Sequence, residues 1–141
     1  MYKFSEEIII NANPEEIFSV YLDVLNWKKW DHGIQSSSIS GPCIVGAVGK
    51  LKPTCGPETE IKIVEIEKNK LFTTQSKLPL CIMTFEHILS LINNSTQVTH
   101  RVSFSGPLSF IFSRLIGNQI RKDLPHVLKN LEHLIETKVT L

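Results

Sequence analysis

The closing segment of the chain, from Pro107 to about Thr137, constrains the fold most, because it predicts one long amphipathic helix. Gly106-Pro107 supplies a start signal, since proline at the first helical position loses no hydrogen bond that the helix would have used. No other stretch sustains such a pattern over comparable length, and most of what precedes it reads as short extended runs. A long helix after a series of strands indicates a sheet wrapped around that helix. The apolar residues of the pattern are Leu108, Phe112, Leu115, Ile116, Ile120, Leu124, Val127, Leu128, Leu131, Leu134 and Ile135.

The helical pattern is not uniform along this segment. The apolar stripe of Leu108–Ile116 and that of Ile120–Ile135 are rotated by roughly a third of a turn at about 100° per residue. The change comes near Gly117, a poor helix former, and Pro125 removes a further backbone bond. We expect two half-helices, of which the first borders a cavity and the second holds the sheet. Two interpretations of the break stay open, a helix that bends to follow a curved sheet and a first half that is a movable wall.

The rest of the chain predicts one strand, two short helices and a run of further strands. Tyr2–Ala12 reads as a strand, after which Asn13 and Pro14 cap and begin a helix. A short helical turn then carries Trp27 and Trp30 on one side, an arrangement more typical of core packing than of stacking on a ligand. The later strands are predicted at Gln35–Ser40, Ala47–Lys52, Glu60–Ile66, Leu71–Lys77, Leu80–Ile92 and Ser95–Ser105.

This order of elements predicts a single α+β domain over residues 1–141. Its architecture would be a curved antiparallel sheet of about seven strands wrapped around the long C-terminal helix, with two short helices between strands 1 and 2, a helix-grip arrangement.

Composition narrows the class of partner. The chain has 141 residues, 42% of them hydrophobic, and a net charge of +1 with its Lys and Arg scattered along the sequence, which argues against nucleic acid. No apolar run approaches the ~20 residues that span a bilayer, so we expect no stable membrane insertion. The N-terminal MYKFSEEIII lacks the pattern of a secretion signal, and Cys43, Cys55 and Cys81 lack any CxxC spacing. We therefore expect a cytoplasmic protein with reduced thiols.

The last two strands have a register that the sequence predicts. If Asn93-Asn94 is a two-residue turn, the numbers of paired residues sum to 187, and one face of the hairpin becomes almost entirely apolar. A three-residue loop would misalign the apolar faces. The predicted pairs on that inner face are Leu91/Thr96, Leu89/Val98, His87/His100, Phe85/Val102 and Met83/Phe104.

This register sets His87 and His100 opposite each other on the inner face. Burial disfavours the imidazolium, so both rings should be neutral near pH 7 and each needs a hydrogen-bond partner. Three interpretations stay open: the two rings satisfy each other or a water in an ordinary core, they hydrogen-bond a ligand, or they bind a metal. The metal is the weakest, because no Cys, Asp or Glu is predicted nearby on that face.

Other chemistry finds little support. The sequence contains no GxSxG, P-loop, HExxH or GxGxxG motif, and no isolated carboxylate falls on a predicted inner face. His126 and His133 fall on the polar side of the second half-helix, where they should be solvated, and His32 lies in a turn that the pattern does not place. We expect no cofactor and no metal.

Three stretches resemble a known family. INANPEEIFSVYLDVLNWKKWD, VGAVGKLKP and GPLSFIFSRLIGNQIRKDLPHVLKNLEHLIE, together with the element order, are similar to the START-like (Bet v 1-like, SRPBCC) superfamily, and within it to the polyketide cyclase/dehydrase and lipid-transport group. The resemblance covers nearly the whole chain and implies a curved sheet gripping the last helix, with an apolar cavity between them. Members bind lipids, sterols, polyketides, quinones or plant hormones, and a minority catalyse cyclisation or dehydration. The family has no invariant catalytic residue to carry over.

Together these features predict binding of a small, mostly apolar ligand, such as a lipid, polyketide, quinone or aromatic metabolite, between the first half-helix and the sheet. His87 and His100 would orient a hydroxyl or carbonyl group of that ligand. One alternative is a cyclase or dehydratase with an inward histidine as general base, and another is a chaperone-type or partner-binding module. The predicted lining residues are His87, His100, Met83, Phe85, Val102, Phe72, Thr74, Phe112, Leu115 and Ile116.

Overall fold

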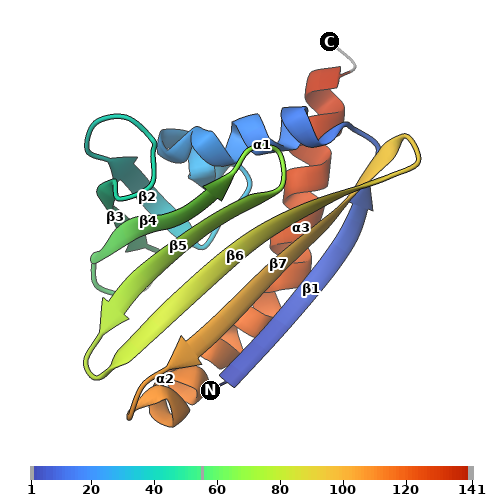
Figure 1. The fold of residues 1–141 in the computed structure, drawn as a ribbon. Helices are drawn as coiled ribbons and strands as arrows, with labels where there is room; N and C mark the ends of the chain where they lie inside the picture. The colour runs from blue at the N-terminus through green and yellow to red at the C-terminus, as the bar shows by residue number, and fades with distance from the viewer. Residues whose placement is uncertain (1, 55, 140–141) are drawn as a thin grey trace.

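The computed structural model describes residues 2–54 and 56–139, so the prediction for Cys55 lies outside the described residues. Its described strands form one antiparallel sheet in the order β1-β7-β6-β5-β4-β3-β2 (Figure 1). Strands β2 to β7 therefore lie side by side in the order of the sequence. The N-terminal strand β1 pairs with β7 and forms the edge opposite β2. The strands are β1 (Tyr2–Ile10), β2 (Ile34–Ile39), β3 (Val48–Pro53), β4 (Thr59–Glu67), β5 (Leu71–Leu78), β6 (Cys81–Ile92) and β7 (Ser95–Ser105).

Two short helices follow β1, as predicted. The Asn13 side chain accepts a hydrogen bond of 3.0 Å from the backbone N–H of Glu16, and Pro14 begins α1 (Pro14–Leu22). The 3-10 helix η1 (Val24–Lys29) comes directly after and ends beside Trp30. Together they cover one end of the sheet's inner face.

The C-terminal segment is divided, and the division falls where the sequence indicated. α2 (Ser109–Leu115) ends before Ile116, and α3 (Gly117–Val139) continues as the long helix, with Pro125 inside it. A Cβ at Gly117 would lie 3.2 Å from the Phe104 ring, so the missing side chain lets the joint approach the sheet closely. α3 runs along the sheet, whereas α2 lies across the end near the N-terminus (Figure 1).

The last hairpin confirms the predicted register at every pair. His87 pairs with His100, and Asn93 adopts a φ of 55°, as the tight turn requires. The inner face of this hairpin packs into two apolar clusters. The larger lies under α1, η1 and the C-terminal part of α3, and the smaller lies at the α2 end around Val102 and Phe104. The histidine pair separates the two clusters.

The architecture is therefore the predicted helix-grip fold, a curved seven-stranded antiparallel sheet around a long C-terminal helix. Among the described residues, no helix is both long enough and apolar enough to cross a membrane.

Candidate functional site: a buried histidine pair

The histidine pair lies in the protein interior. His87 and His100 are both buried, and their ring centroids are 4.7 Å apart with the ring planes at 80°. Each ring, however, has its own hydrogen-bond partner on another element, so the pair does not satisfy itself.

His87 is held by the neighbouring strand. Its Nδ1 lies 2.9 Å from the carbonyl oxygen of Phe72, and since a carbonyl only accepts, Nδ1 carries the proton and donates. In the neutral ring, Nε2 then presents a lone pair. This Nε2 has no hydrogen-bond partner among the described residues.

His100 is held by α1. Its Nε2 lies 2.8 Å from the Tyr21 hydroxyl, and Tyr21 is completely buried. Burial raises the pKa of the Tyr21 phenol well above its ordinary value, so the phenol keeps its proton. When that phenol donates to Nε2, the neutral His100 ring carries its own proton on Nδ1, which has no partner in the described part of the chain.

Both imidazoles are kept neutral by their surroundings. Burial lowers the pKa of His87 to about 4, although the hydrogen bond to Phe72 acts in the opposite direction. Burial lowers the pKa of His100 well below its ordinary value, and the neighbouring His87 lowers it further. Both shifts favour the neutral rings that the sequence predicts near pH 7.

Two tryptophans, Trp27 on η1 and Trp30 directly after it, close over the pair. The indole N–H of Trp27 donates to the backbone oxygen of Tyr21 at 2.9 Å. The Trp30 ring lies 6.3 Å from the His87 ring and 5.9 Å from the His100 ring, between centroids. Trp30 is only 2% exposed, yet its indole N–H has no partner among the described residues. Both tryptophans pack in the core, as their spacing suggested.

These rings bring unpaired hydrogen-bonding groups together. Trp30 carries a buried ring N–H without a partner, and its ring centroid lies within 6.3 Å of those of His87 and His100, each of which has one nitrogen that forms no hydrogen bond with a described residue. Buried polar groups are normally satisfied, and an unsatisfied one costs about 1 to 3 kcal/mol. A lone pair beside N–H donors suits a hydroxyl group, which both donates and accepts.

The structure brings most, but not all, of the predicted lining residues to this face. Phe72 and Thr74 are buried on β5 and pair with His87 and Phe85 on β6. Met83, Phe85, Val102 and Phe112 belong to the smaller apolar cluster. Ile116 is partly buried at the joint between α2 and α3. Leu115 is not brought to the interior, because α2 turns its side chain to solvent, where it is 73% exposed.

The inner face also carries a carboxylate, contrary to the sequence analysis. Glu6 pairs with His100 across β1 and β7 and so shares its face. This carboxylate was not predicted, because the pairing of β1 was not assigned from the sequence. Glu6 lies on an edge strand with its side chain exposed. No group of three or more potential metal ligands occurs among the described residues.

The inner space beside the histidines is filled by side chains, since Tyr21, Trp27, Trp30 and Phe72 are all buried there. A pocket of about 220 Å³ lies elsewhere, between the start of β1 and the joint of α2 with α3. It is lined by Tyr2, Lys3, Phe4, Ser113, Arg114, Asn118 and Arg121.

A comparison with known protein families assigns the chain to one of them. The sequence model of the family described as polyketide cyclase / dehydrase and lipid transport matches residues 1–136. The chain belongs to this family. None of the curated proteins compared with it matches.

Solved structures similar to this family member support the same fold. The crystal structure of Ara h 8.0201 has a TM-score of 0.76 at 16% identity, covering 96% of this chain and 98% of that one. Norcoclaurine synthase from Thalictrum flavum, in complex with dopamine and hydroxybenzaldehyde, has a TM-score of 0.69 at 14% identity, with coverages of 96% and 87%. The Aha1 dimer from Colwellia psychrerythraea has a TM-score of 0.72 at 22% identity, with coverages of 96% and 97%. These likenesses show the fold, which is the START-like arrangement expected from the sequence.

For this family member, sequence reasoning missed the partners of the histidines. Tyr21 lies on the buried side of α1, and its contact with His100 joins residues 79 positions apart. A tyrosine on the apolar face of a helix is the available signal, because its buried hydroxyl requires a hydrogen-bond partner.

Proposed function

We propose that the chain binds a small, mostly apolar ligand between the sheet and the C-terminal helices, with a hydroxyl group directed at His87 and His100. The observation that carries the proposal is the buried indole N–H of Trp30, which has no partner among the described residues and whose ring lies beside the rings of His87 and His100. Family membership supports it, because the family description includes lipid transport.

The chemistry of the cluster favours a ligand with an alcohol or phenol group. Such a group donates to the lone pair on His87 Nε2 and accepts from the N–H of His100 or Trp30, whereas a carbonyl only accepts. Apolar walls supply affinity at roughly 25 cal/mol per Å² of buried apolar surface, before the cost of ordering the ligand. A similar structure, that of norcoclaurine synthase, holds dopamine and hydroxybenzaldehyde.

Binding also requires a side chain to move. Tyr21 and Trp30 occupy the space in front of the histidines, and both are buried in the structure. We propose that Trp30 turns away first, because its indole N–H forms no hydrogen bond with a described residue, whereas Tyr21 is held at 2.8 Å by His100.

Catalysis is the second candidate, and the Tyr21–His100 contact of 2.8 Å is the observation that favours it. A tyrosine and a histidine in contact supply an acid and a base for a cyclase or dehydratase reaction. The lowered pKa of both histidines makes them weak bases near neutral pH, which favours binding over turnover.

A partner-binding module is the third candidate, favoured by the filled interior. Such a role predicts an inner face packed by its own side chains, as Tyr21, Trp27 and Trp30 pack it here, and exposed apolar residues elsewhere. We also propose a cytoplasmic location, since Cys43 and Cys81 are free thiols.

Native mass spectrometry of the purified protein tests the binding function directly. A co-purifying small molecule supports it, and its repeated absence across expression hosts counts against it. Calorimetry with 1-naphthol and naphthalene then tests the hydroxyl preference. We expect the naphthol to bind more tightly, and the double variant His87→Phe/His100→Phe to abolish the difference.

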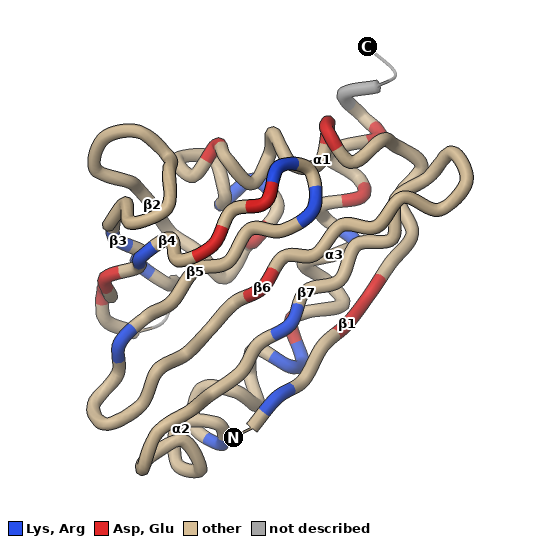
Figure 2. Tube along the Cα trace, in the orientation of Figure 1, with Lys and Arg blue, Asp and Glu red and all other residues tan. Residues whose placement is uncertain are grey.

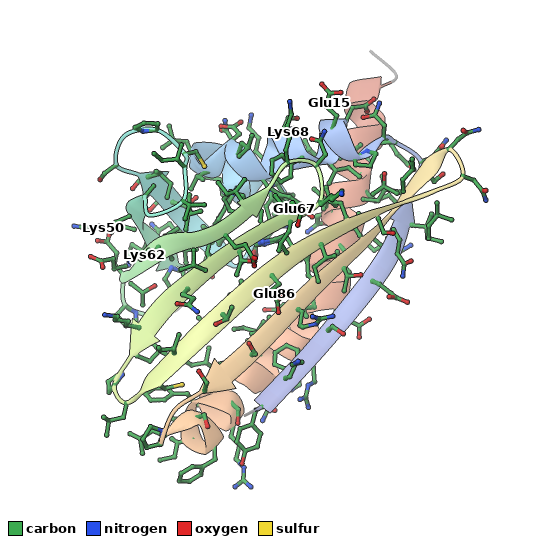
Figure 3. The ribbon with its side chains drawn as sticks, viewed as in Figure 1. Glu15, Lys50, Lys62, Glu67, Lys68 and Glu86 are labelled. Carbon is green, nitrogen blue, oxygen red and sulfur yellow. The ribbon has the colours of Figure 1, made fainter. Side chains whose placement is uncertain are left out.

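A matched control changes a charged pair on the opposite face of the same strands. Arg101 and Glu86 lie 3.7 Å apart on the outer face, where Figure 3 shows Glu86. The variant Glu86→Gln/Arg101→Gln should keep the preference for naphthol. Equal affinity of the two compounds for the unaltered protein would remove the role assigned to the histidines.

A further inference from the structure

The end of the molecule formed by α2, the start of β1 and the turn between β5 and β6 is basic. Its segments, residues 2–5, 77–82 and 106–122, contain Lys3, Lys77, Arg114, Arg121 and Lys122 and no Asp or Glu. The segments lie together, because the backbone N–H of Leu108 donates to the carbonyl of Leu80 at 3.0 Å, and residues of β1 and α2 line one pocket. We call this region the basic end; Figure 2 shows its blue segments without red ones.

The charges of the basic end are not neutralised from within. None of its five cations forms an ion pair with a described residue. The ion pairs among the described residues lie outside the basic end and join Lys50, Lys70, Arg101 and Lys129 to glutamates. The nearest carboxylate along α3 is Asp123, whose two oxygens accept from Gln119 Nε2 at 3.1 and 3.2 Å. Labelled glutamates such as Glu15 and Glu67 lie toward the opposite end of the molecule (Figure 3).

The pocket of about 220 Å³ lies within the basic end. Lys3, Arg114 and Arg121 line it together with the polar side chains of Ser113 and Asn118. The Arg121 guanidinium lies 4.8 Å from the centre of the Phe4 ring, a cation–π contact that holds it at the pocket wall. Cations and hydrogen-bonding side chains around a pocket of this size suit a phosphate or carboxylate group.

Exposed apolar side chains lie at the same end of the molecule as this basic pocket. Three of them lie on α2: Phe110, Ile111 and Leu115, the last 73% exposed. Leu80 lies at the turn between β5 and β6, which contacts the start of α2. Tyr2 and Ile82 are further exposed apolar residues of the same end. Apolar residues exposed among cations are typical of surfaces that enter the interface of an anionic membrane.

We propose that the basic end docks on an anionic lipid bilayer. One anionic headgroup enters the pocket lined by Lys3, Arg114 and Arg121, while Leu115 and its apolar neighbours on α2 enter the interface. A bilayer matches both features, because its surface is negatively charged and its interface accepts apolar side chains. A nucleic acid would match the charge alone. The docking does not rest on the interior histidine site, which lies on the inner face between the two apolar clusters.

Flotation with lipid vesicles tests the proposal. Vesicles of phosphatidylcholine mixed with equal parts of phosphatidylglycerol should bind the protein, and pure phosphatidylcholine vesicles should bind it far less. The variant Lys3→Ala/Arg114→Ala should lower the partition constant about 30-fold, since each basic residue near such a surface contributes about 1 kcal/mol. Both residues are exposed, so the fold should be retained.

Two matched controls lie on η1, away from the basic end. Lys28→Ala/Lys29→Ala makes the same charge change at exposed positions, and we expect it to leave the partition constant nearly unchanged. Leu115→Ser should weaken binding, whereas Leu25→Ser, at a residue with a similar exposure of 67%, should not.

Several results would overturn the proposal. Equal binding to both kinds of vesicle, or equal losses in the η1 controls, would show that the basic end is not the docking surface. Inorganic phosphate and soluble dihexanoyl phosphatidylglycerol, added without vesicles and followed by NMR shifts of the pocket residues, separate a free anion from a bilayer. Binding of these soluble anions with no vesicle binding would establish a small-molecule anion site in place of a membrane surface. Absence of vesicle binding together with capture of an acidic protein would assign the surface to a protein partner.

Discussion

α2 and α3 follow one another in a single apolar pattern, yet the fold uses them differently. α3 buries Leu124, Val127, Leu128, Leu131 and Ile135 against the sheet, so its apolar stripe is a core surface. α2 leaves Phe110, Ile111 and Leu115 exposed beside a basic pocket. The difference teaches that an apolar periodicity identifies a helix and its stripe but not what covers that stripe. Here the break at Gly117 separates a structural helix from one available for contacts.

Alanine substitutions provide the strongest test of this contrast. Leu128→Ala should lower the free energy of unfolding by about 2 to 5 kcal/mol, because it leaves a cavity in a packed core. Leu115→Ala deletes the same atoms from a side chain that is already exposed to solvent. It should therefore change the free energy of unfolding by less than about 0.5 kcal/mol. Urea unfolding followed by tryptophan fluorescence measures both. Similar losses in the two variants would mean that α2 is packed as tightly as α3.

Acidification should destabilise the fold through the buried histidine pair. The unfolded histidine titrates near pH 6.5 but folded His87 near pH 4, so the unfolded chain binds more protons between these values. The free energy of unfolding is therefore highest above pH 6.5 and falls as the pH drops toward 4. From His87 alone, the loss at pH 5 should be on the order of 2 kcal/mol. His100 acts in the same direction. Urea unfolding at pH 5 and pH 7 measures the difference.

A double variant separates the histidines from other titrating groups. His87→Phe/His100→Phe should flatten the pH dependence between pH 7 and pH 5. Asp31 acts with the opposite sign, since burial raises its pKa and protonation below that pKa favours the folded state. An unaltered slope in the double variant would show that the histidines titrate normally in the folded protein.

Tyr21→Phe tests the hydrogen bond that joins α1 to the histidine pair. The variant keeps the ring but leaves His100 Nε2 buried without its partner, at a cost of about 1 to 2 kcal/mol in unfolding free energy. It should also change the His100 imidazole signals in NMR spectra. Ser19→Ala on the exposed side of α1 is the control and should cost less. Equal costs would indicate that the buried hydrogen bond adds nothing to stability.

The smallest expected effect concerns the pocket wall. Arg121→Ala removes the cation from the Phe4 ring, and an exposed cation–π contact contributes about 0.5 to 1 kcal/mol. Thermal unfolding should therefore shift by only a few degrees. Arg121→Lys keeps the charge and should recover part of the shift. A loss as large as that of Leu128→Ala would contradict the view of this end as a surface feature.

The sequence was sufficient for the features that local patterns control. The register of β6 and β7 follows from strict alternation on both sides of a two-residue turn, which left one pairing with matching apolar faces. From that pairing came the juxtaposition of His87 and His100. The division of the helix near Gly117 followed from the rotation of the apolar stripe.

Features that depend on packing between distant elements could not be predicted in this way. The contact of Tyr21 with His100 depends on how α1 lies on the sheet, which periodicity does not specify. Leu115 shares the helical pattern of buried residues and is exposed only because α2 lies across the end of the sheet. Lys3 and Arg114 are scattered in sequence, and they form a basic pocket only once β1 pairs with the last strand.

That pairing also sets the order in which the protein can assemble. Among the strands of this sheet, β1 is synthesised first, but its hydrogen-bonding partner is β7, and Tyr2 pairs with Phe104. At about 5 to 20 residues per second, β1 waits about 5 to 20 s on the ribosome before β7 emerges. Until then its hydrogen-bonding edge has no native partner, and the largest loop of the sheet must close last. Completion of the sheet should therefore be a late event in folding, after the hairpins from β2 to β7 have formed.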